Sequence, residues 1–179
     1  MFRAPIREGL CLELLEERHA PEVFSLVDRD YLRQWLPWVD ATKTADDTLS
    51  FIKSSLEQFA SGHGFAAGIW SDQRVCGIIG THKLDLLNRQ GEIGYWLGQS
   101  FQGQGIVTAA CRAVIAHLFD DLDLHRIVLR CAQDNEKSCS VARRLGFSEE
   151  GLAREAVLLH GHFHDARLFA LLRRDWKPL

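Results

Sequence analysis

The chain shows two spacings of hydrophobic residues, and each spacing predicts a different kind of element. Continuous or alternating apolar runs rich in β-branched and aromatic residues are typical of strands. Apolar residues three or four positions apart are typical of helices that pack on one face. The predicted strands are 10–15, 65–70, 75–83, 92–97, 125–131, 147–159 and 163–173. The predicted helices are 19–32, 44–62, the segment that follows Gly105, and 135–146.

Local signals support two of these helices. Thr44 is followed three residues later by Asp47, which is the spacing of a capping box at a helix start. Pro21 is compatible with the helix over 19–32, because proline is tolerated in the first turn.

The order of these elements predicts the fold class. Three successive strands between 65 and 97 favour antiparallel pairing, whereas the strand–helix–strand unit from Ile93 to Cys131 implies one parallel pair with a right-handed crossover. We therefore expect a mixed α/β (α+β) fold around a mostly antiparallel sheet of six to seven strands. No repeat, linker or low-complexity tract divides the chain, so residues 1–179 are expected to form a single domain.

Charge and cysteine content narrow the class of protein. The net charge is −3, whereas a nucleic-acid binder would usually show a basic excess, so no nucleic-acid partner is expected. No apolar run reaches the ~18–20 residues of a membrane helix, and the start lacks a signal-peptide run. The five cysteines include no Cys-x-x-Cys, and all but Cys139 lie in apolar runs. This pattern favours reduced core thiols in a cytoplasmic protein that does not bind membranes.

The stretch 100–107 carries the clearest chemical signal. Gly103 and Gly105 lack the Cβ atoms that would hinder a ligand, and they allow positive φ angles. The free N–H groups and positive dipole end of the following helix suit a phosphate or pyrophosphate. The alternative is a tight turn without a ligand. The Walker loop is excluded because no Gly-Lys-Ser/Thr occurs, and the dinucleotide fingerprint because Thr108 replaces its third glycine.

Several motifs occur in a recognisable order between Leu10 and Trp176. They are Leu12-Glu13-Leu14-Leu15, Trp35-Leu36-Pro37-Trp38, Glu92-Ile93-Gly94-Tyr95-Trp96-Leu97, Phe101-Gln102-Gly103-Gln104-Gly105-Ile106, Asp134-Asn135-Glu136-Lys137-Ser138, Leu145-Gly146-Phe147, Glu149-Glu150-Gly151 and His164-Asp165. In this order and spacing they resemble the Gcn5-related N-acetyltransferase (GNAT) family and its RimL-like ribosomal-protein acetyltransferase branch. The resemblance implies transfer of an acetyl group from acetyl-CoA to an amine.

The resemblance also implies where the cosubstrate binds. In the family, helices cover both faces of the sheet, the parallel strands splay apart, and acetyl-CoA lies in the gap. The implied cofactor-binding residues are Trp96, Leu97, Gln102, Gly103, Gln104, Gly105, Ile106, Val107, Thr108, Asn135 and Ser138. Ser100 departs from the Gln or Arg that the wider family has at that position. Thr108 could instead cap the helix, and the side chains of Trp96 and Leu97 could serve only in packing.

Asn135 and Ser138 match the Asn-x-x-Ser segment of the RimL-like branch. The resemblance implies that Ser138 lies near the CoA sulfur and donates a proton to the leaving thiolate. Many members use a tyrosine seven residues after the asparagine, but Ala142 occupies that position here. Ser138 is therefore the predicted acid. Asn135 is expected to bind the cofactor or nearby backbone, with capping of the short helix as the alternative.

The acceptor side is predicted from fewer residues. Glu92 is the candidate general base, acting directly or through water, and its alternative is a solvated strand residue or a salt-bridge partner. Trp35, Trp38 and Tyr95 are candidate acceptor-binding residues, although the tryptophans could instead form a hydrophobic lid over the core.

A cluster near the C-terminal end superficially resembles a metal site. It consists of His160, His162, His164 and Asp165. Gly161 predicts a turn in its midst, and the family uses this stretch structurally, so no metal is expected.

The predicted function is an acetyl-CoA-dependent N-acetyltransferase whose acceptor amine attacks the thioester directly. The expected acceptor is the N-terminal α-amine of a protein, such as a ribosomal protein. A small-molecule amine and a non-catalytic acetyl-CoA-binding module remain as alternatives. The resemblance also implies a homodimer.

Overall fold

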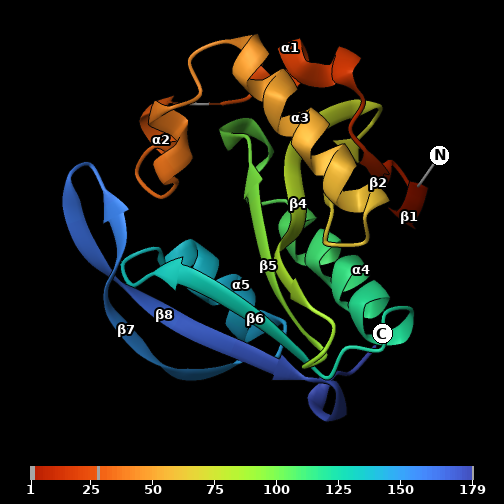
Figure 1. The fold of residues 1–179 in the computed structure, drawn as a ribbon, viewed down its shortest axis with the longest axis vertical. Helices are drawn as coiled ribbons and strands as arrows, with labels where there is room; N and C mark the ends of the chain where they lie inside the picture. Colours follow the sequence, from red (N-terminus) through yellow and green to blue (C-terminus); the bar gives the residue numbers. More distant parts are fainter. Residues whose placement is uncertain (1–2, 28, 179) are drawn as a thin grey trace.

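The computed structural model describes residues 3–27 and 29–178. Within these residues, eight strands form one sheet in the order β1-β2-β3-β4-β5-β6-β8-β7 (Figure 1). The strands are β1 (Arg3–Arg7), β2 (Leu10–Leu14), β3 (Ala66–Ser71), β4 (Arg74–Asp85), β5 (Gln90–Leu97), β6 (Arg126–Ala132), β7 (Ser148–Leu159) and β8 (His162–Leu172). Paired strands are antiparallel except β5 and β6, which are parallel. The predicted mixed, mostly antiparallel fold is confirmed.

The sheet has one strand more than the six to seven that the sequence predicts. The extra strand is β1, at the edge of the sheet, where Pro5 lies opposite Cys11 and the register shifts just after it. Proline cannot donate a ladder hydrogen bond, so it is tolerated on an edge strand. Two arginines and a proline in five residues hide this strand from a hydrophobicity pattern.

The helices are α1 (Ala20–Ser25), α2 (Arg29–Leu32), α3 (Ala45–Ala60), α4 (Ile106–Asp120) and α5 (Glu136–Arg144). Short 3₁₀ turns occupy Glu17–His19, Pro37–Asp40, Gln99–Phe101 and Arg173–Asp175. The single helix predicted over 19–32 is wrong, because the chain leaves helical conformation between α1 and α2. The capping box of α3 is confirmed: the Thr44 N–H donates to Asp47 Oδ2 at 2.9 Å, and the Asp47 N–H donates to Thr44 Oγ1 at 3.4 Å.

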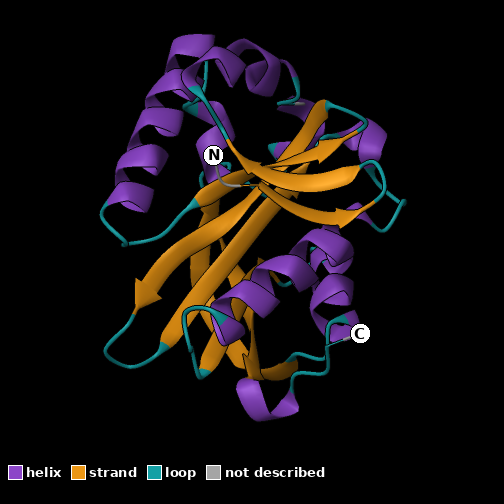
Figure 2. Cartoon of the chain, turned by 90° about the vertical axis from the view of Figure 1, so that its right-hand side faces the viewer, coloured by secondary structure: helices purple, strands orange, loops and turns teal. Residues whose placement is uncertain are grey.

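Helices cover both faces of the sheet (Figure 2). Leu10 and Leu12 of β2 belong to the apolar core that includes α4, whereas Cys11 belongs to the core that includes α1 and α3. Successive strand residues point to opposite faces, so these two cores lie on opposite sides of the sheet. No helix in the described part of the chain combines the length and apolar character needed to cross a membrane.

The parallel strands β5 and β6 pair over a short distance only. Their register contains three pairs, and the last joins Glu92 to Val128. Beyond it β5 stays paired with β4, and β6 stays paired with β8. Figure 1 shows the two strands diverging from their shared lower end. This is the splayed parallel pair that the resemblance implies, and it leaves one edge of β5 unpaired.

Candidate active site

The glycine loop has the backbone that the sequence predicts. Gly103 and Gly105 have φ angles of 76° and 73°, in the left-handed region that other residues adopt only at a cost. Gly105 is the N-cap of α4. Thr108 lies inside the first turn, so its alternative role as the helix cap is wrong. The unpaired N–H groups at the start of α4 are therefore available to an anion.

A cavity of about 1120 Å³, called the larger cavity, extends from this loop along the end of β5 to α2 and α5. Its lining includes most of the predicted cofactor-binding residues: Trp96, Leu97, Gln102, Gly103, Gly105, Ile106, Val107, Thr108, Asn135 and Ser138. Trp35 lines it as well. Gln104 lies outside the lining; its carbonyl accepts from Arg7 Nη2 at 3.3 Å, and its amide donates to the Ser100 carbonyl at 3.4 Å.

Three cationic residues of the larger cavity were missed by the sequence analysis: Arg112, Lys137 and Arg144. Arg144 donates to Thr108 Oγ1 at 2.9 Å, and Lys137 donates to Gln102 Oε1 at 3.2 Å. Residues four or seven apart share a helix face. Arg112 follows Thr108 by four residues, and Arg144 follows Lys137 by seven. Helical spacing could therefore have revealed Arg112 and Arg144.

Ser138 forms a hydrogen bond with Tyr95 inside the larger cavity. The two hydroxyl oxygens are 2.9 Å apart. Burial is the main cause that raises the pKa of Tyr95 well above its ordinary value, so the phenol stays protonated. Asn135 caps α5 by accepting the Ser138 N–H at 3.2 Å, which is its alternative role, and it also lines the cavity.

A second cavity of about 440 Å³, called the smaller cavity, lies between α3 and strands β4 and β5. Leu36, Tyr95 and Trp96 line both cavities, so the two spaces meet at the unpaired end of β5. Trp38 lines the smaller cavity, and its ring centroid is 5.7 Å from that of Trp96. Of the three predicted acceptor-binding residues, Tyr95 lies at the junction of the two cavities, Trp38 lines the smaller cavity beside Trp96, and Trp35 lines only the larger cavity.

The lining of the smaller cavity is apolar and polar, and among its described residues it includes the imidazole of His82 but no carboxylate, lysine or arginine. Its polar side chains include Thr42, Thr48, Ser54, Ser55 and Gln58. Thr48 is 4% exposed, and its Oγ1 has no hydrogen-bond partner among the described residues. A buried hydroxyl without a partner is unfavourable, so this atom is suited to bind a polar group that enters the cavity.

Residues 9–148 match the model of the acetyltransferase (GNAT) domain. The chain belongs to the GNAT family. YdaF of Bacillus subtilis (strain 168) is 38% identical over 99% of this chain and 98% of its own length. Relatives of this chain are named acetyltransferases. Because it also has the GNAT domain, this protein is an acetyl-CoA-dependent N-acetyltransferase.

Two solved GNAT structures match the whole fold. RimL, the α-N-protein acetyltransferase of ribosomal L7/L12, was solved with coenzyme A; it has a TM-score of 0.92 at 29% identity, over 96% of this chain and 98% of its own. The microcin C7 self-immunity acetyltransferase MccE was solved with acetyl-CoA and AMP; it has a TM-score of 0.89 at 28% identity, over 93% of this chain and 94% of its own.

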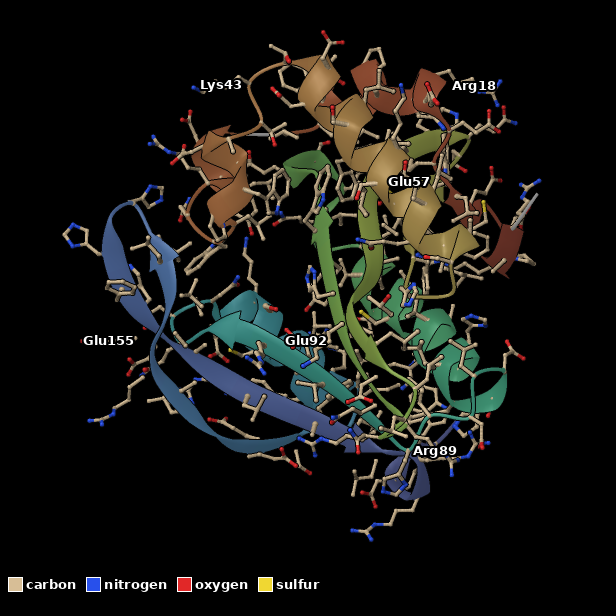
Figure 3. The ribbon with its side chains drawn as sticks, viewed as in Figure 1. Arg18, Lys43, Glu57, Arg89, Glu92 and Glu155 are labelled. Carbon is tan, nitrogen blue, oxygen red and sulfur yellow. The ribbon has the colours of Figure 1, made fainter. Side chains whose placement is uncertain are left out.

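Glu92 lies at the point where the GNAT strands β5 and β6 diverge, and Figure 3 labels it there. It lines neither cavity. Its Oε2 forms an ion pair with Arg130 Nε at 3.4 Å, as the salt-bridge alternative expects. The side chain is 22% exposed.

The histidine-rich stretch surrounds the turn between β7 and β8. Asp165 Oδ1 accepts the Glu155 N–H at 2.8 Å, which is a structural contact within this hairpin. The residues that the structure describes include no group of three or more His, Cys, Asp or Glu that could hold a metal ion.

Proposed function

We propose that the protein transfers the acetyl group of acetyl-CoA to the N-terminal α-amine of a protein, such as a ribosomal protein. The observation that carries this proposal is the junction of the two cavities at Tyr95 and Trp96. The larger cavity suits the cosubstrate and the smaller one suits the acceptor. A structural neighbour named as an α-N-protein acetyltransferase of ribosomal L7/L12 supports this choice of acceptor.

The larger cavity fits acetyl-CoA in shape and in charge. The N–H groups between Gly103 and Val107 would hold the pyrophosphate at the start of α4. Arg112, Lys137 and Arg144 add three positive charges along the same cavity, which suits the phosphates of CoA.

The unpaired edge of β5 suits the pantetheine arm and the thioester. Backbone N–H groups on the stretch that ends at Trp96 and Leu97 would donate to the pantetheine amide and to the thioester carbonyl. A donor fixed at that carbonyl stabilises the negative charge that develops on its oxygen as the amine attacks.

Ser138 and Tyr95 are proposed to protonate the leaving sulfur. Ser138 would donate its hydroxyl proton to the thiolate, and the Tyr95 phenol, 2.9 Å away, would return one to the serine oxygen. The raised pKa of Tyr95 supports this role, because the phenol remains a donor throughout the working pH range. The pair takes the place of the tyrosine that many family members have at the position of Ala142.

The acceptor is proposed to be an α-amine because this amine needs little help to lose its proton. An α-amine has an ordinary pKa of about 7.7–8.0, so about a tenth is neutral at pH 7. Removing the proton from a lysine ammonium, whose ordinary pKa is about 10.4, costs about 4–5 kcal/mol at pH 7. The smaller cavity has no carboxylate among its described lining residues to offset that cost.

A small-molecule amine is the second candidate acceptor. The neighbour MccE was solved with both acetyl-CoA and AMP, so this fold accommodates a small molecule beside the cosubstrate. The smaller cavity, at about 440 Å³, lies in the ~300–1,000 Å³ range of small-molecule sites.

Release of free CoA from acetyl-CoA tests the choice of acceptor. One peptide carries a free N-terminus and no lysine, and the other has a blocked N-terminus and one lysine. We expect release with the first peptide only. Release with neither peptide, while acetyl-CoA still binds, would contradict a protein N-terminus and favour a small amine.

Replacing Thr48 by valine is expected to raise KM for the acceptor peptide about two- to thirteenfold, with kcat nearly unchanged. Valine has the shape of threonine but lacks the hydroxyl, so one hydrogen bond of about 0.5–1.5 kcal/mol to the acceptor is lost. The same change removes an unpaired buried hydroxyl, so the free energy of unfolding should rise. Steady-state kinetics and thermal unfolding measure the two effects. An unchanged KM would show that the acceptor does not reach Thr48.

We propose that residues 1–179 act as one domain, in the cytoplasm and as a homodimer. All five cysteines are buried free thiols, which supports a reducing compartment. Sedimentation at several protein concentrations tests the homodimer.

A further inference from the structure

The smaller cavity contains one side chain with the chemistry of a general base, the imidazole of His82. The titratable residues among its described lining are His82 and Tyr95. Tyr95 is excluded because burial raises its pKa well above its ordinary value. Imidazole is the side chain that ordinarily changes charge between pH 5 and 8. His82 is also exposed, so it can exchange protons with water.

A β-bulge turns His82 into this cavity. Thr81 pairs with Ile93, and Lys83 pairs with Glu92, so His82 is the extra residue between two consecutive pairs. In a regular strand, residues 81 and 82 would point to opposite faces. Here both line the smaller cavity. Bulges commonly redirect a side chain in this way beside active sites.

The bulge is held in place by Phe65, the residue just before β3. The Thr81 N–H donates to the Phe65 carbonyl at 2.9 Å, and the Phe65 N–H donates to Thr81 Oγ1 at 3.0 Å. These two hydrogen bonds fix the backbone just before His82, so the direction of its side chain is built into the sheet.

Gly94 provides the space for the imidazole. A Cβ atom at position 94 would lie 1.8 Å from His82 Nε2, so the ring occupies the place of the missing side chain. Gly80 lies opposite Gly94 in the register, and both line the smaller cavity. The imidazole of His82 therefore lies over Gly94, whereas a Cβ atom at Gly80 would meet the backbone of Phe65 and Ala66.

The imidazole over Gly94 is close to the junction of the two cavities. Gly94 is two residues before Trp96, which is about 6.6 Å along a strand. It also lies on the part of β5 that no longer pairs with β6, because the last pair is Glu92 with Val128. An amine held beside the imidazole that covers Gly94 would therefore face a thioester that lies against the unpaired edge of β5.

We propose that His82 is the general base that takes a proton from the acceptor amine. This inference rests on the proposed function for its acceptor, and it assigns the base to a residue other than Glu92. Glu92 forms an ion pair with Arg130 and lies outside both linings.

Few other charges bear on His82 from the elements around the smaller cavity. On β4 the nearest along the chain is Lys83, and on β5 it is Glu92. The covering elements carry further charges: Asp46, Asp47, Lys53 and Glu57 on α3, Glu22 on α1, and Asp40 in the 3₁₀ turn Pro37–Asp40. All of these residues lie outside the lining of the cavity. The face that α3 turns to the cavity is uncharged, with Ser54, Ser55 and Gln58.

Acetyl transfer to an ammonium ion requires two protons to leave nitrogen and one to reach sulfur. The acceptor gives its first proton to His82, which passes it to water. The neutral nitrogen forms the C–N bond as the C–S bond breaks, and nitrogen then loses its second proton to water. Ser138 supplies one proton to the sulfur and regains one from water through Tyr95, which balances that second loss. The products are the acetylated amine, CoA and one proton released to solvent.

The test is the pH dependence of kcat/KM in His82→Ala with the free-N-terminus peptide. The wild type should show one ionisation on its acid side, that of an imidazole, because the base allows it to use the ammonium form of the peptide. The variant should instead follow the ionisation of the α-amine at about 7.7–8.0, because it can use only the neutral amine. At pH 7 we expect kcat/KM to fall about tenfold, because about a tenth of the amine is already neutral. Added imidazole should restore part of the activity.

Two further variants identify the cause of any loss. His63→Ala removes a histidine that lines neither cavity, and its kinetics should match the wild type. Gly94→Ala keeps the imidazole but displaces it, so it should lower kcat/KM in the same direction as His82→Ala. Acetyl-CoA affinity and melting temperature of His82→Ala should stay at wild-type values. An unchanged pH profile in His82→Ala, or a loss in Glu92→Gln alone, would overturn the proposal.

Hydrolysis of acetyl-CoA in the absence of any amine separates this inference from the proposed function. Water as the acceptor also needs a base, so His82→Ala should slow the background release of CoA. If the wild type acetylates no peptide but His82→Ala still slows hydrolysis, the protein acceptor is wrong and the base is supported. If peptides are acetylated and His82→Ala equals the wild type in both reactions, the base is wrong and the acceptor is supported.

Discussion

Replacing Ser138 by alanine is expected to lower kcat for acetyl transfer by about two orders of magnitude, the usual contribution of a positioned acid. The reason is the hydroxyl pair that Ser138 forms with Tyr95 at 2.9 Å in the larger cavity. Without the serine, CoA would have to leave as an unprotonated thiolate. Tyr95→Phe removes only the second hydroxyl and should lower kcat by about tenfold, because water can still reprotonate the serine.

The pH dependence distinguishes an acid from a merely structural serine. A free thiol has an ordinary pKa of about 8.5, so above that pH the thiolate is a competent leaving group without a donor. The defect of Ser138→Ala should therefore shrink as pH rises from 7 to 9.5. Ser148→Ala, an exposed serine at the start of β7, is the matched control and should retain wild-type kcat. A pH-independent defect, or an unchanged kcat in folded Ser138→Ala, would contradict the role of the hydroxyl.

The sequence was most informative where the signal is local. The glycine loop, the capping box at Thr44 and most strands depend on residues within a few positions of one another, and all three are observed. The splayed strand pair, in contrast, was expected only from the resemblance to a family. Periodicity reports which residues of a strand face the core, but not how far apart two strands lie.

The residues missed or incompletely described by the sequence analysis depend on contacts between distant segments. Tyr95 was assigned to the acceptor, yet its hydroxyl bonds to Ser138, 43 positions away in the sequence. The side chain of His82 points into the smaller cavity because of a β-bulge. The two-residue period of a strand does not predict where such an extra residue is inserted. Nothing in the sequence distinguishes Thr48 from other helix residues. Only the packing of α3 against the sheet shows that its hydroxyl is buried without a partner among the described residues.

Replacing both Gly103 and Gly105 by valine is expected to weaken acetyl-CoA binding by about 30- to 700-fold. Both residues have φ angles in the left-handed region, where an L-residue costs about 1–2 kcal/mol. A Cβ atom at either position would meet nothing within 4 Å, so the penalty comes from backbone conformation and not from a clash. If the bound pyrophosphate requires this conformation, the two penalties sum to about 2–4 kcal/mol of binding free energy. Titration calorimetry with acetyl-CoA measures the change in Kd.

The control is a second pair of glycines with the same strain and no contact with the larger cavity. Gly62, after α3, and Gly161, in the turn between β7 and β8, have φ angles of 72° and 78°, and a Cβ atom there would also be unobstructed. Gly62→Val/Gly161→Val should therefore lose a similar free energy of unfolding while keeping the wild-type Kd. Equal losses of affinity in the two double variants would mean that destabilisation alone explains the effect. A loss confined to the loop variant would show that the left-handed backbone of the loop is a requirement of binding, beyond its place in the fold.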